Sequence, residues 1–403
     1  MRPLLVKLHR WFGIGIALFL FMSGLTGAVI AWDHELDAAL NPGFYHARSN
    51  GPELPPLELA RRVEAADPRL RVTYLPLGVE PGHALQMRVE GRIDPATNAP
   101  YDLGFNQLSI DPATGAIQGR REWGAPSLSR LNVLPFLYQL HYTLYLPWMV
   151  GGLSTGVWLL GVVAIVWLFD SLIALVLAFP SAKSWRKSLV FRVKRGGYPL
   201  TFDLHRSGGV WVWGLLLVIA TTSVSMNLPA QVMRPVVSLF STLTPSPFYD
   251  AGKLPIPKPG SAALPRERIV ELAREAGRGA QLAAAPGAIY FASALNVYAV
   301  GYFAPGGDEG ESPLGNPWIY WNGATGERIA SNLPGRGSAG DLFMEAQFPL
   351  HSGRIGGLAG RIAVSFMGVT VALLSVTGLV IWLKKRRARR KIGRALQLPS
   401  RFV

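Results

Sequence analysis

Four apolar stretches constrain this chain of 403 residues more than any other feature of its sequence. They cover residues 11–32, 153–179, 208–228 and 362–383, and Asp170 is the only charged residue within them. Each is long enough to cross a bilayer as a helix, which takes about 20 residues. We therefore predict an α-helical membrane protein with four transmembrane helices. The first stretch is longer than the apolar core of about 7–15 residues in cleaved signal peptides, so we expect it to remain as an anchor.

Basic residues indicate the orientation of these helices. Of the 40 Lys and Arg residues, 19 lie in residues 1–10, 180–206 and 384–403, together with a single acidic residue. Cytoplasmic segments next to membrane helices carry an excess of Lys and Arg, so we expect these three segments and both termini on the cytoplasmic side. Residues of about 33–140 and 229–350 then lie outside. Membrane topology and contact with membrane lipid explain the net charge of +15, and we expect no nucleic-acid partner.

Three short patterns occur twice in the same order, at offsets of 196–211 residues. The matching segments are residues 8–10 and 204–206, 110–115 and 321–326, and 140–141 and 350–351. Both copies enter the membrane from the cytoplasmic side. The pattern therefore predicts a parallel internal duplication, with a pseudo-two-fold axis along the membrane normal.

The two outer segments are each predicted to form a small α+β module. The expected elements are a helix at 56–66 with strands at 71–75, 85–90, 105–110 and 116–121, then a helix at 265–276 with strands at 289–292, 296–303 and 318–321. In each module a stretch ending in Ala-Thr-Gly predicts a tight hairpin turn. The proline-rich residues 244–259 predict a stiff linker.

These assignments divide the chain into eight parts. In order they are residues 1–32 (start and first span), 33–140 (first module), 141–179 (outer histidine and second span), 180–204 (basic loop), 205–228 (third span), 229–350 (linker and second module), 351–383 (outer histidine and fourth span) and 384–403 (basic tail).

Four of the seven histidines occupy equivalent places in the two halves. His9 and His205 lie at the cytoplasmic ends of the first and third spans, and His141 and His351 precede the second and fourth spans on the outer side. The chain has no cysteine, which excludes Cys-ligated metals and covalently attached c-type haem. Two axial imidazoles hold a b-type haem, so we predict two haem b groups, one between His9 and His205 and one between His141 and His351.

The surroundings of these histidines suggest further roles. Arg10, Arg206 and Arg354 are candidates to bind the haem propionates, and glycines beside the histidines offer room for a flat ring. Asp203 is a candidate to orient His205. Asp170, an ionisable residue within a span, is a candidate proton relay or partner of a buried donor.

The outer histidines lie at some distance along the chain from the spans that follow them. His141 and His351 lie 12 and 11 residues before the spans, so we expect them to stand above the hydrocarbon on extended or kinked helices. The competing interpretation is that all four histidines are ordinary boundary residues with a structural role.

Several of these segments resemble the PepSY-associated transmembrane family. The similar segments are Leu-His-Arg-Trp-Phe-Gly at 8–13, Ser-Gly-Leu-Thr-Gly at 23–27, Leu-His-Tyr at 140–142 and Leu-His-Ser at 350–352, and the outer modules resemble PepSY domains. The chain is similar to inner-membrane ferric-siderophore reductases of the FoxB type. The resemblance implies haem, a bacterial inner-membrane location with periplasmic modules, and reduction of a ferric siderophore in the periplasm.

Other interpretations of the sequence remain. The electron donor of such a reductase is either a cytoplasmic protein or a quinol, and the sequence leaves the siderophore and the oligomeric state open. The chain is alternatively a non-enzymatic PepSY protein that binds or regulates periplasmic partners. A third interpretation is a haem or siderophore permease.

Overall fold

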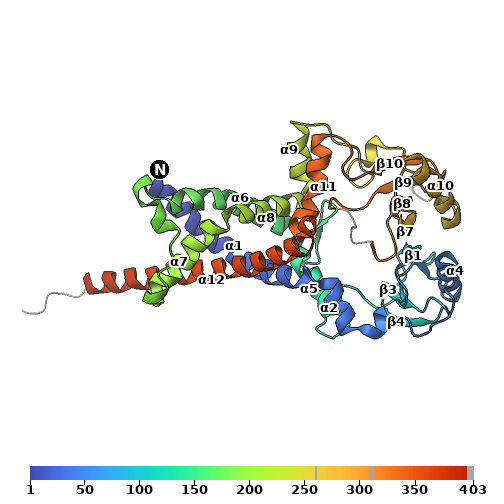
Figure 1. Ribbon diagram of the computed structural model, residues 1–403, viewed down its shortest axis with the longest axis horizontal. Coiled ribbons are helices and arrows are strands. Elements are labelled where there is room, and N and C mark those ends of the chain that lie inside the picture. Colours follow the sequence, from blue (N-terminus) through green and yellow to red (C-terminus); the bar gives the residue numbers. More distant parts are fainter. Residues whose placement is uncertain (259–260, 308–312, 397–403) are drawn as a thin grey trace, which may run out of the picture. The chain divides into compact units, whose positions relative to one another are not determined.

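The computed structural model describes residues 1–258, 261–307 and 313–396, which form two units (Figure 1). One unit, here called the helical unit, comprises Met1–Ala31, Tyr138–Met233 and Leu350–Val403. The other, here called the sheet unit, comprises Trp32–Leu137 and Arg234–Pro349.

Three helices of the helical unit are long and apolar enough to cross a membrane. They are α1 (Arg2–Ile30), α6 (Thr155–Ala178) and α12 (Gly357–Leu396). They contain most of the first, second and fourth apolar stretches of the sequence. The chain is therefore a helical membrane-associated protein, as its hydropathy predicts. Helix α12 is longer than its apolar stretch because it continues into the basic residues that follow.

The third apolar stretch lies in two helices that meet at a bend, and these are long and apolar enough to cross a membrane only as a pair. Helix α7 (Gly197–Trp211) begins before the apolar stretch, and α8 (Trp213–Asn227) follows after a bend of 72°. Gly208 and Gly209 lie in the last turn of α7, where glycine weakens helical continuity. Helix α8 alone has 15 residues, about 22 Å, so this crossing needs part of α7 to reach a length of about 30 Å.

Small residues bring α1 and α12 into close contact. A Cβ atom added at Gly24 would lie 2.6 Å from the backbone oxygen of Gly368, so the crossing requires glycine. Arg361, which hydropathy alone places at the membrane edge, donates from Nε to the Ala31 carbonyl at 2.9 Å and thereby caps α1. Helix α6 packs on α1 and on α8 (Figure 1).

The remaining elements of the helical unit are short. They are α5 (Val133–Thr143, which begins in the sheet unit), β5 (Met149–Val150), β6 (Leu153–Ser154), the 3-10 helices η1 (Ala182–Ser188), η2 (Val193–Arg195) and η6 (Arg354–Gly356), and the π-helical turn η3 (Pro229–Met233).

The sheet unit contains one antiparallel sheet of eight strands, in the order β10-β9-β8-β7-β1-β2-β3-β4. The strands are β1 (Leu70–Pro76), β2 (Leu85–Gly91), β3 (Gln107–Ile110), β4 (Ile117–Arg121), β7 (Pro286–Ala292), β8 (Val297–Tyr302), β9 (Trp318–Asn322) and β10 (Arg328–Asn332). The two predicted modules are therefore not separate bodies. They join where β1 pairs with β7, with Leu75 opposite Ile289.

Two helices complete one shared core. Residues of α4 (Pro56–Ala66) and α10 (Arg266–Gly279) enter the same apolar cluster as the strands, with Leu59 and Ile269 almost fully buried. Arg266 of α10 binds both carboxylate oxygens of Glu64 in α4, at 2.6 and 3.0 Å. The two α+β halves are thus held together by apolar packing, by the strand pairing and by this ion pair.

The two predicted hairpin turns have the same construction. The Asp111 carboxylate accepts the backbone N–H groups of Ala113 and Thr114, and the Asn322 side-chain oxygen accepts the equivalent N–H groups. Each turn ends in a glycine with positive φ, a backbone conformation that glycine adopts without steric cost.

The proline-rich segment is not a free linker within its described residues. Thr244 binds Asp341, Asp250 pairs with Arg234 at 2.6 Å, and the Pro255 carbonyl accepts a bond from Asn322. The other elements of the sheet unit are α2 (Asp33–Leu40), α3 (Pro42–Tyr45), α9 (Arg234–Ser238), η4 (Ala251–Lys253) and α11 (Ala339–Ser352, which ends in the helical unit).

Candidate functional site

The structure brings His9 of α1 close to His205 of α7. The centroids of the two imidazole rings lie 6.1 Å apart. His9 Nδ1 lies 2.9 and 3.1 Å from the two carboxylate oxygens of Asp170, which is buried on α6. A carboxylate accepts hydrogen bonds, so His9 Nδ1 carries the proton and donates.

His205 is oriented by α12. Its Nδ1 lies 3.0 Å from the Leu374 carbonyl oxygen and 3.3 Å from Thr377 Oγ1. A carbonyl oxygen only accepts, so His205 also carries its proton on Nδ1. Both imidazoles of this pair therefore have the same tautomer.

A second pair joins His141 of α5 to His351 of α11, with ring centroids 6.2 Å apart. His141 Nδ1 lies 3.0 Å from Thr26 Oγ1 of α1, and His351 Nδ1 lies 3.0 Å from Thr222 Oγ1 of α8. These histidines are on helices separate from α6 and α12, not on extensions of them. The expected extension of the spans is therefore absent for these two histidines, and their rings contact the helices α1 and α8 directly.

The two threonines also determine the tautomer of this pair. Thr26 Oγ1 donates to the Met22 carbonyl at 2.8 Å, and Thr222 Oγ1 donates to the Val218 carbonyl at 2.9 Å. A hydroxyl has one proton, so each threonine accepts from the histidine that it meets. All four histidines thus carry a proton on Nδ1, and the neutral form of each has its lone pair on Nε2.

This is the arrangement expected of metal-binding histidines. A protein group that accepts the other ring N–H fixes the ring and its tautomer in most metal sites. Within the described residues, none of the four Nε2 atoms hydrogen-bonds to another group. In the neutral form of each ring, Nε2 is therefore available for a ligand in both pairs.

The ring separations also fit a shared axial ion. A metal–imidazole bond of about 2.0 Å places each ring centre about 3 Å from the metal, so two imidazoles on opposite sides have centres about 6 Å apart. The observed separations are 6.1 and 6.2 Å. A tetrahedral or octahedral protein cage does not fit, since no group of three or more His, Cys, Asp or Glu in the described chain is placed to hold a metal.

Two glycines make room for the imidazoles. A Cβ atom added at Gly27 would lie 3.0 Å from Cε1 of His141, and one at Gly378 would lie 2.9 Å from Cε1 of His205. By contrast, Gly13 and Gly15, which lie beside His9 in the sequence, have nothing within 4 Å of an added Cβ. Gly27 and Gly378 thus lie close to imidazoles, whereas Gly13 and Gly15, which the sequence suggested as room for a flat ring, border open space.

Asp203 does not orient His205, and this prediction is wrong. Its buried carboxylate accepts from Arg192 at 2.7–3.0 Å and pairs with Arg206 at 3.5 Å. Arg206 also donates to the carbonyl of Lys187, while its buried Nε lacks a partner among the described residues.

The other predicted side chains stay close to their histidines in the chain. Arg10 follows His9 on α1, and Arg354 begins η6, shortly after His351; both are partly buried. Asp170 is the hydrogen-bond partner of His9, which is one of the two roles considered for it.

The structure adds Thr26, Thr222 and Thr377, which sequence reasoning missed. A signal was present, because Thr-Gly occurs inside the first and the fourth span at 26–27 and 377–378. Each threonine lies four or more residues from either end of its helix, where a hydroxyl bonded to its own helix is ordinary. Only the contact with a histidine from another helix distinguishes them.

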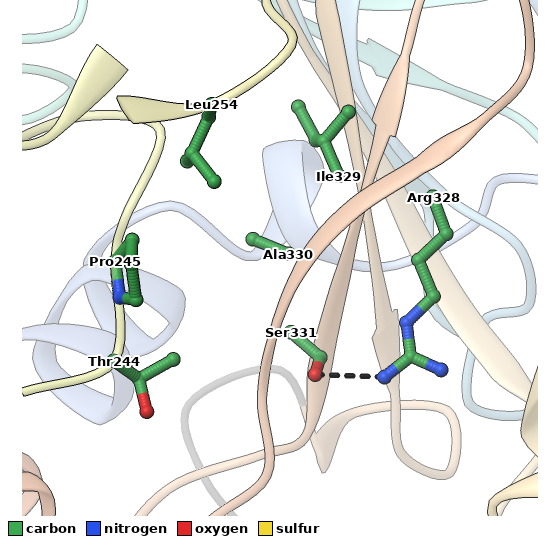
Figure 2. A pocket seen from close by; sticks show the side chains of 7 residues that line it. All are labelled: Thr244, Pro245, Leu254, Arg328, Ile329, Ala330 and Ser331. Carbon is green, nitrogen blue, oxygen red and sulfur yellow. Dashed lines mark hydrogen bonds between the residues drawn. The ribbon is translucent and has the colours of Figure 1, made fainter. Parts of the chain in front are cut away.

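The sheet unit has a pocket between β10 and the proline-rich segment (Figure 2). Arg328 is the only ionisable side chain of its lining, and it donates to Ser331 Oγ at 2.9 Å. The rest of the lining is Thr244, Pro245, Leu254, Ile329 and Ala330. The hydroxyls of Thr244 and Ser331 have no acid or base beside them in this lining.

The fold and the paired histidines define a class of protein, namely a helical membrane protein with an antiparallel α+β unit. The chain belongs to the PepSY-associated TM region family, whose model matches residues 6–385. No curated protein matches the chain.

Proposed function

We propose that this chain is a haem b reductase of the bacterial inner membrane that delivers electrons to a ferric siderophore in the periplasm and releases Fe(II). One observation supports it above the others. Four histidines from different helices form two pairs, and each carries its proton on Nδ1, so that Nε2 is free.

Each histidine pair has an assigned role in the proposal. His9 and His205 hold one haem, and His141 and His351 hold the other. Arg10, Arg206 and Arg354 are the candidates to bind propionates, and the unpartnered Nε of Arg206 is a donor available for this. A haem held by two imidazoles supplies a one-electron carrier.

The hydrogen-bond partners of the histidines give the two pairs different electrostatic surroundings. Asp170 is a carboxylate bonded to His9, whereas the other three histidines bond to neutral oxygens. A negative second partner makes an imidazole more basic and a stronger ligand for the higher charge state of a metal. The two pairs therefore have different electrostatic surroundings, with the more negative one at His9.

The pairs are at opposite ends of one helix. His9 and Gly27, which contacts His141, are both in α1 and lie 18 residues apart, or about 27 Å. This is close to the hydrocarbon thickness of about 30 Å. The basic clusters favour the end with His9 as the cytoplasmic end, and the repeated patterns support a parallel internal duplication.

The substrate follows from the proposed position and from iron chemistry. A cytoplasmic protein or a quinol gives an electron, and Fe(III) in the chelate becomes Fe(II). The lower charge attracts anionic oxygen ligands less strongly, so the siderophore releases the ion.

Vesicles containing the full chain test this proposal. A reductant is enclosed inside, a ferric siderophore is added outside, and an Fe(II) indicator is followed. We expect Fe(II) to form in vesicles with the wild-type chain and at least tenfold more slowly with His9→Ala or His351→Ala. His34→Ala is the control, since His34 lies in the sheet unit outside both pairs. Equal rates for wild type, His9→Ala and empty vesicles would contradict the proposal and leave a non-enzymatic binding protein.

A further inference from the structure

The sheet unit contains a third histidine pair, which the proposed function does not use. His46 and His83 face each other across an isolated antiparallel bridge, with ring centroids 5.1 Å apart. His46 is exposed and His83 is partly exposed, so a ligand can reach both.

The backbone fixes this pair from both sides. Ala47 N–H donates to the Gly82 carbonyl at 2.9 Å, and Ala84 N–H donates to the Tyr45 carbonyl at 2.8 Å. These two bonds flank the histidines, which therefore form a non-hydrogen-bonded pair. In such a pair the two side chains lie on the same face and come closest. The imidazoles are held together by main-chain geometry that does not depend on a ligand.

The separation of the two rings differs from that in the helical unit. Two imidazoles that bind one ion at a tetrahedral angle have ring centres about 5 Å apart, whereas imidazoles on opposite sides have centres about 6 Å apart. The observed 5.1 Å matches the tetrahedral value, and the helical pairs match the opposite-side value. The distance between ring centres thus distinguishes the His46–His83 pair from the two pairs of the helical unit.

A carboxylate completes the arrangement. Glu80 Oε2 lies 3.9 Å from His83 Nδ1, and this buried Nδ1 has no hydrogen-bond partner among the described residues. A metal on Nε2 would leave Nδ1 protonated and close to the carboxylate, which is the usual carboxylate–histidine–metal sequence. The same order of groups occurs at Asp170 and His9.

We propose that His46 and His83 bind a divalent transition-metal ion of the borderline class that imidazole prefers, such as Zn²⁺ or Fe²⁺. Glu80 is a positioning residue that orients His83. Water or an exogenous ligand fills the remaining positions, since the described residues offer no third ligand of the His, Cys, Asp or Glu type. This inference does not depend on haem or on reductase activity.

Calorimetric titration of the purified full chain with Zn²⁺ tests the site, and an anaerobic titration with Fe²⁺ tests whether the same pair holds reduced iron. We expect wild type to bind about one ion per chain at this pair. His46→Ala and His83→Ala should each weaken binding at least tenfold, and Glu80→Gln should weaken it less. His34→Ala is the matched control, because His34 is another exposed histidine of the sheet unit and should leave the affinity unchanged.

The outcomes are decisive in either direction. Loss of Zn²⁺ or Fe²⁺ binding in His46→Ala and His83→Ala, but not in His34→Ala, supports the site, and the ion that binds more tightly identifies the occupant. Absence of binding of both ions, or equal affinity in all variants, would overturn it. The visible spectrum of the same samples reports on the helical pairs, so failure of one proposal is distinguishable from failure of the other.

Discussion

Threonine has an unusual role in the helical unit. Thr26 and Thr222 donate to carbonyls of their own helices and accept from histidines of other helices. Because the helix carbonyl takes the hydroxyl proton, the hydroxyl oxygen can only accept from the imidazole, and the imidazole proton is therefore on Nδ1. This explains how a histidine can be held in one tautomer without a charged partner in an apolar surrounding.

Thr26→Val tests this role. Valine has the same shape but cannot accept the His141 Nδ1 proton, and loss of such a partner usually costs about 10- to 100-fold in affinity for a bound metal. We expect haem retention to fall by that factor at the His141–His351 pair alone, measured by haem titration. Thr370→Val is the matched control, because Thr370 is partly exposed on α12 and, among the described residues, bonds to Phe366 of its own helix. Equal losses in both variants would contradict the role of Thr26.

Gly378→Val tests the close fit at the other pair. Even a Cβ atom at Gly378 would lie 2.9 Å from His205, so a larger side chain must displace the imidazole. We expect the haem signal of the His9–His205 pair to be lost while that of the other pair remains in the visible spectrum. Gly279→Val, at an open position at the end of α10 in the sheet unit, should leave both signals. If Gly378→Val also retains both signals, the imidazole of His205 is not a ligand.

The elements of the sheet unit were largely predictable, whereas their joining was not. Helix α4 has the predicted ends, and the ends of the predicted strands differ from the observed ones by at most three residues. Alternation of apolar residues specifies a strand but not its neighbour, so the pairing of β1 with β7 was missed. The bend between α7 and α8 was missed for a similar reason, because hydropathy records length and not direction.

Glu64→Gln tests the joint between the two halves of the sheet unit. Burial alone would raise the pKa of Glu64, but the hydrogen bonds and charge of Arg266 outweigh it and hold this pKa below the ordinary value. The ionised pair therefore stabilises the fold above pH of about 4.3, and this stabilisation is lost as the pH falls further. We expect the variant to lower the free energy of unfolding by about 2 kcal/mol at pH 7.

Scanning fluorimetry between pH 7 and 3 measures this effect. The difference between wild type and Glu64→Gln should shrink below pH of about 4, because wild type then loses the same charge. Glu271→Gln is the control, since Glu271 is in an exposed pair with Arg268 and should change stability little. A constant difference at all pH values would show that the charge of Glu64 is unimportant.

For the candidate site, the sequence predicts only which histidines occupy equivalent positions in the two halves. The repeat at residues 8–10 and 204–206 predicts that His9 and His205 form a pair, and in the structure their ring centroids lie 6.1 Å apart. The partners of the rings were not predictable in the same way. Asp203 is close to His205 in sequence yet binds Arg192, whereas Thr377 is distant in sequence and lies beside the ring. Contacts between helices decide these partners, and one sequence does not contain them.

At the scale of the whole molecule, two histidine pairs at opposite ends of the helical unit are the basis of the proposed function. Each pair is formed by two helices, and each ring is oriented by a further residue from another helix. A redox role for the chain therefore requires that each pair bind its own haem.

The haem-to-protein ratio of the purified full chain, supplied with haem during expression, tests this requirement most directly. The account predicts about two haem b groups in wild type, with about one in His9→Ala and about one in His351→Ala. A colourless wild-type protein, or the same haem content in all three proteins, would contradict it.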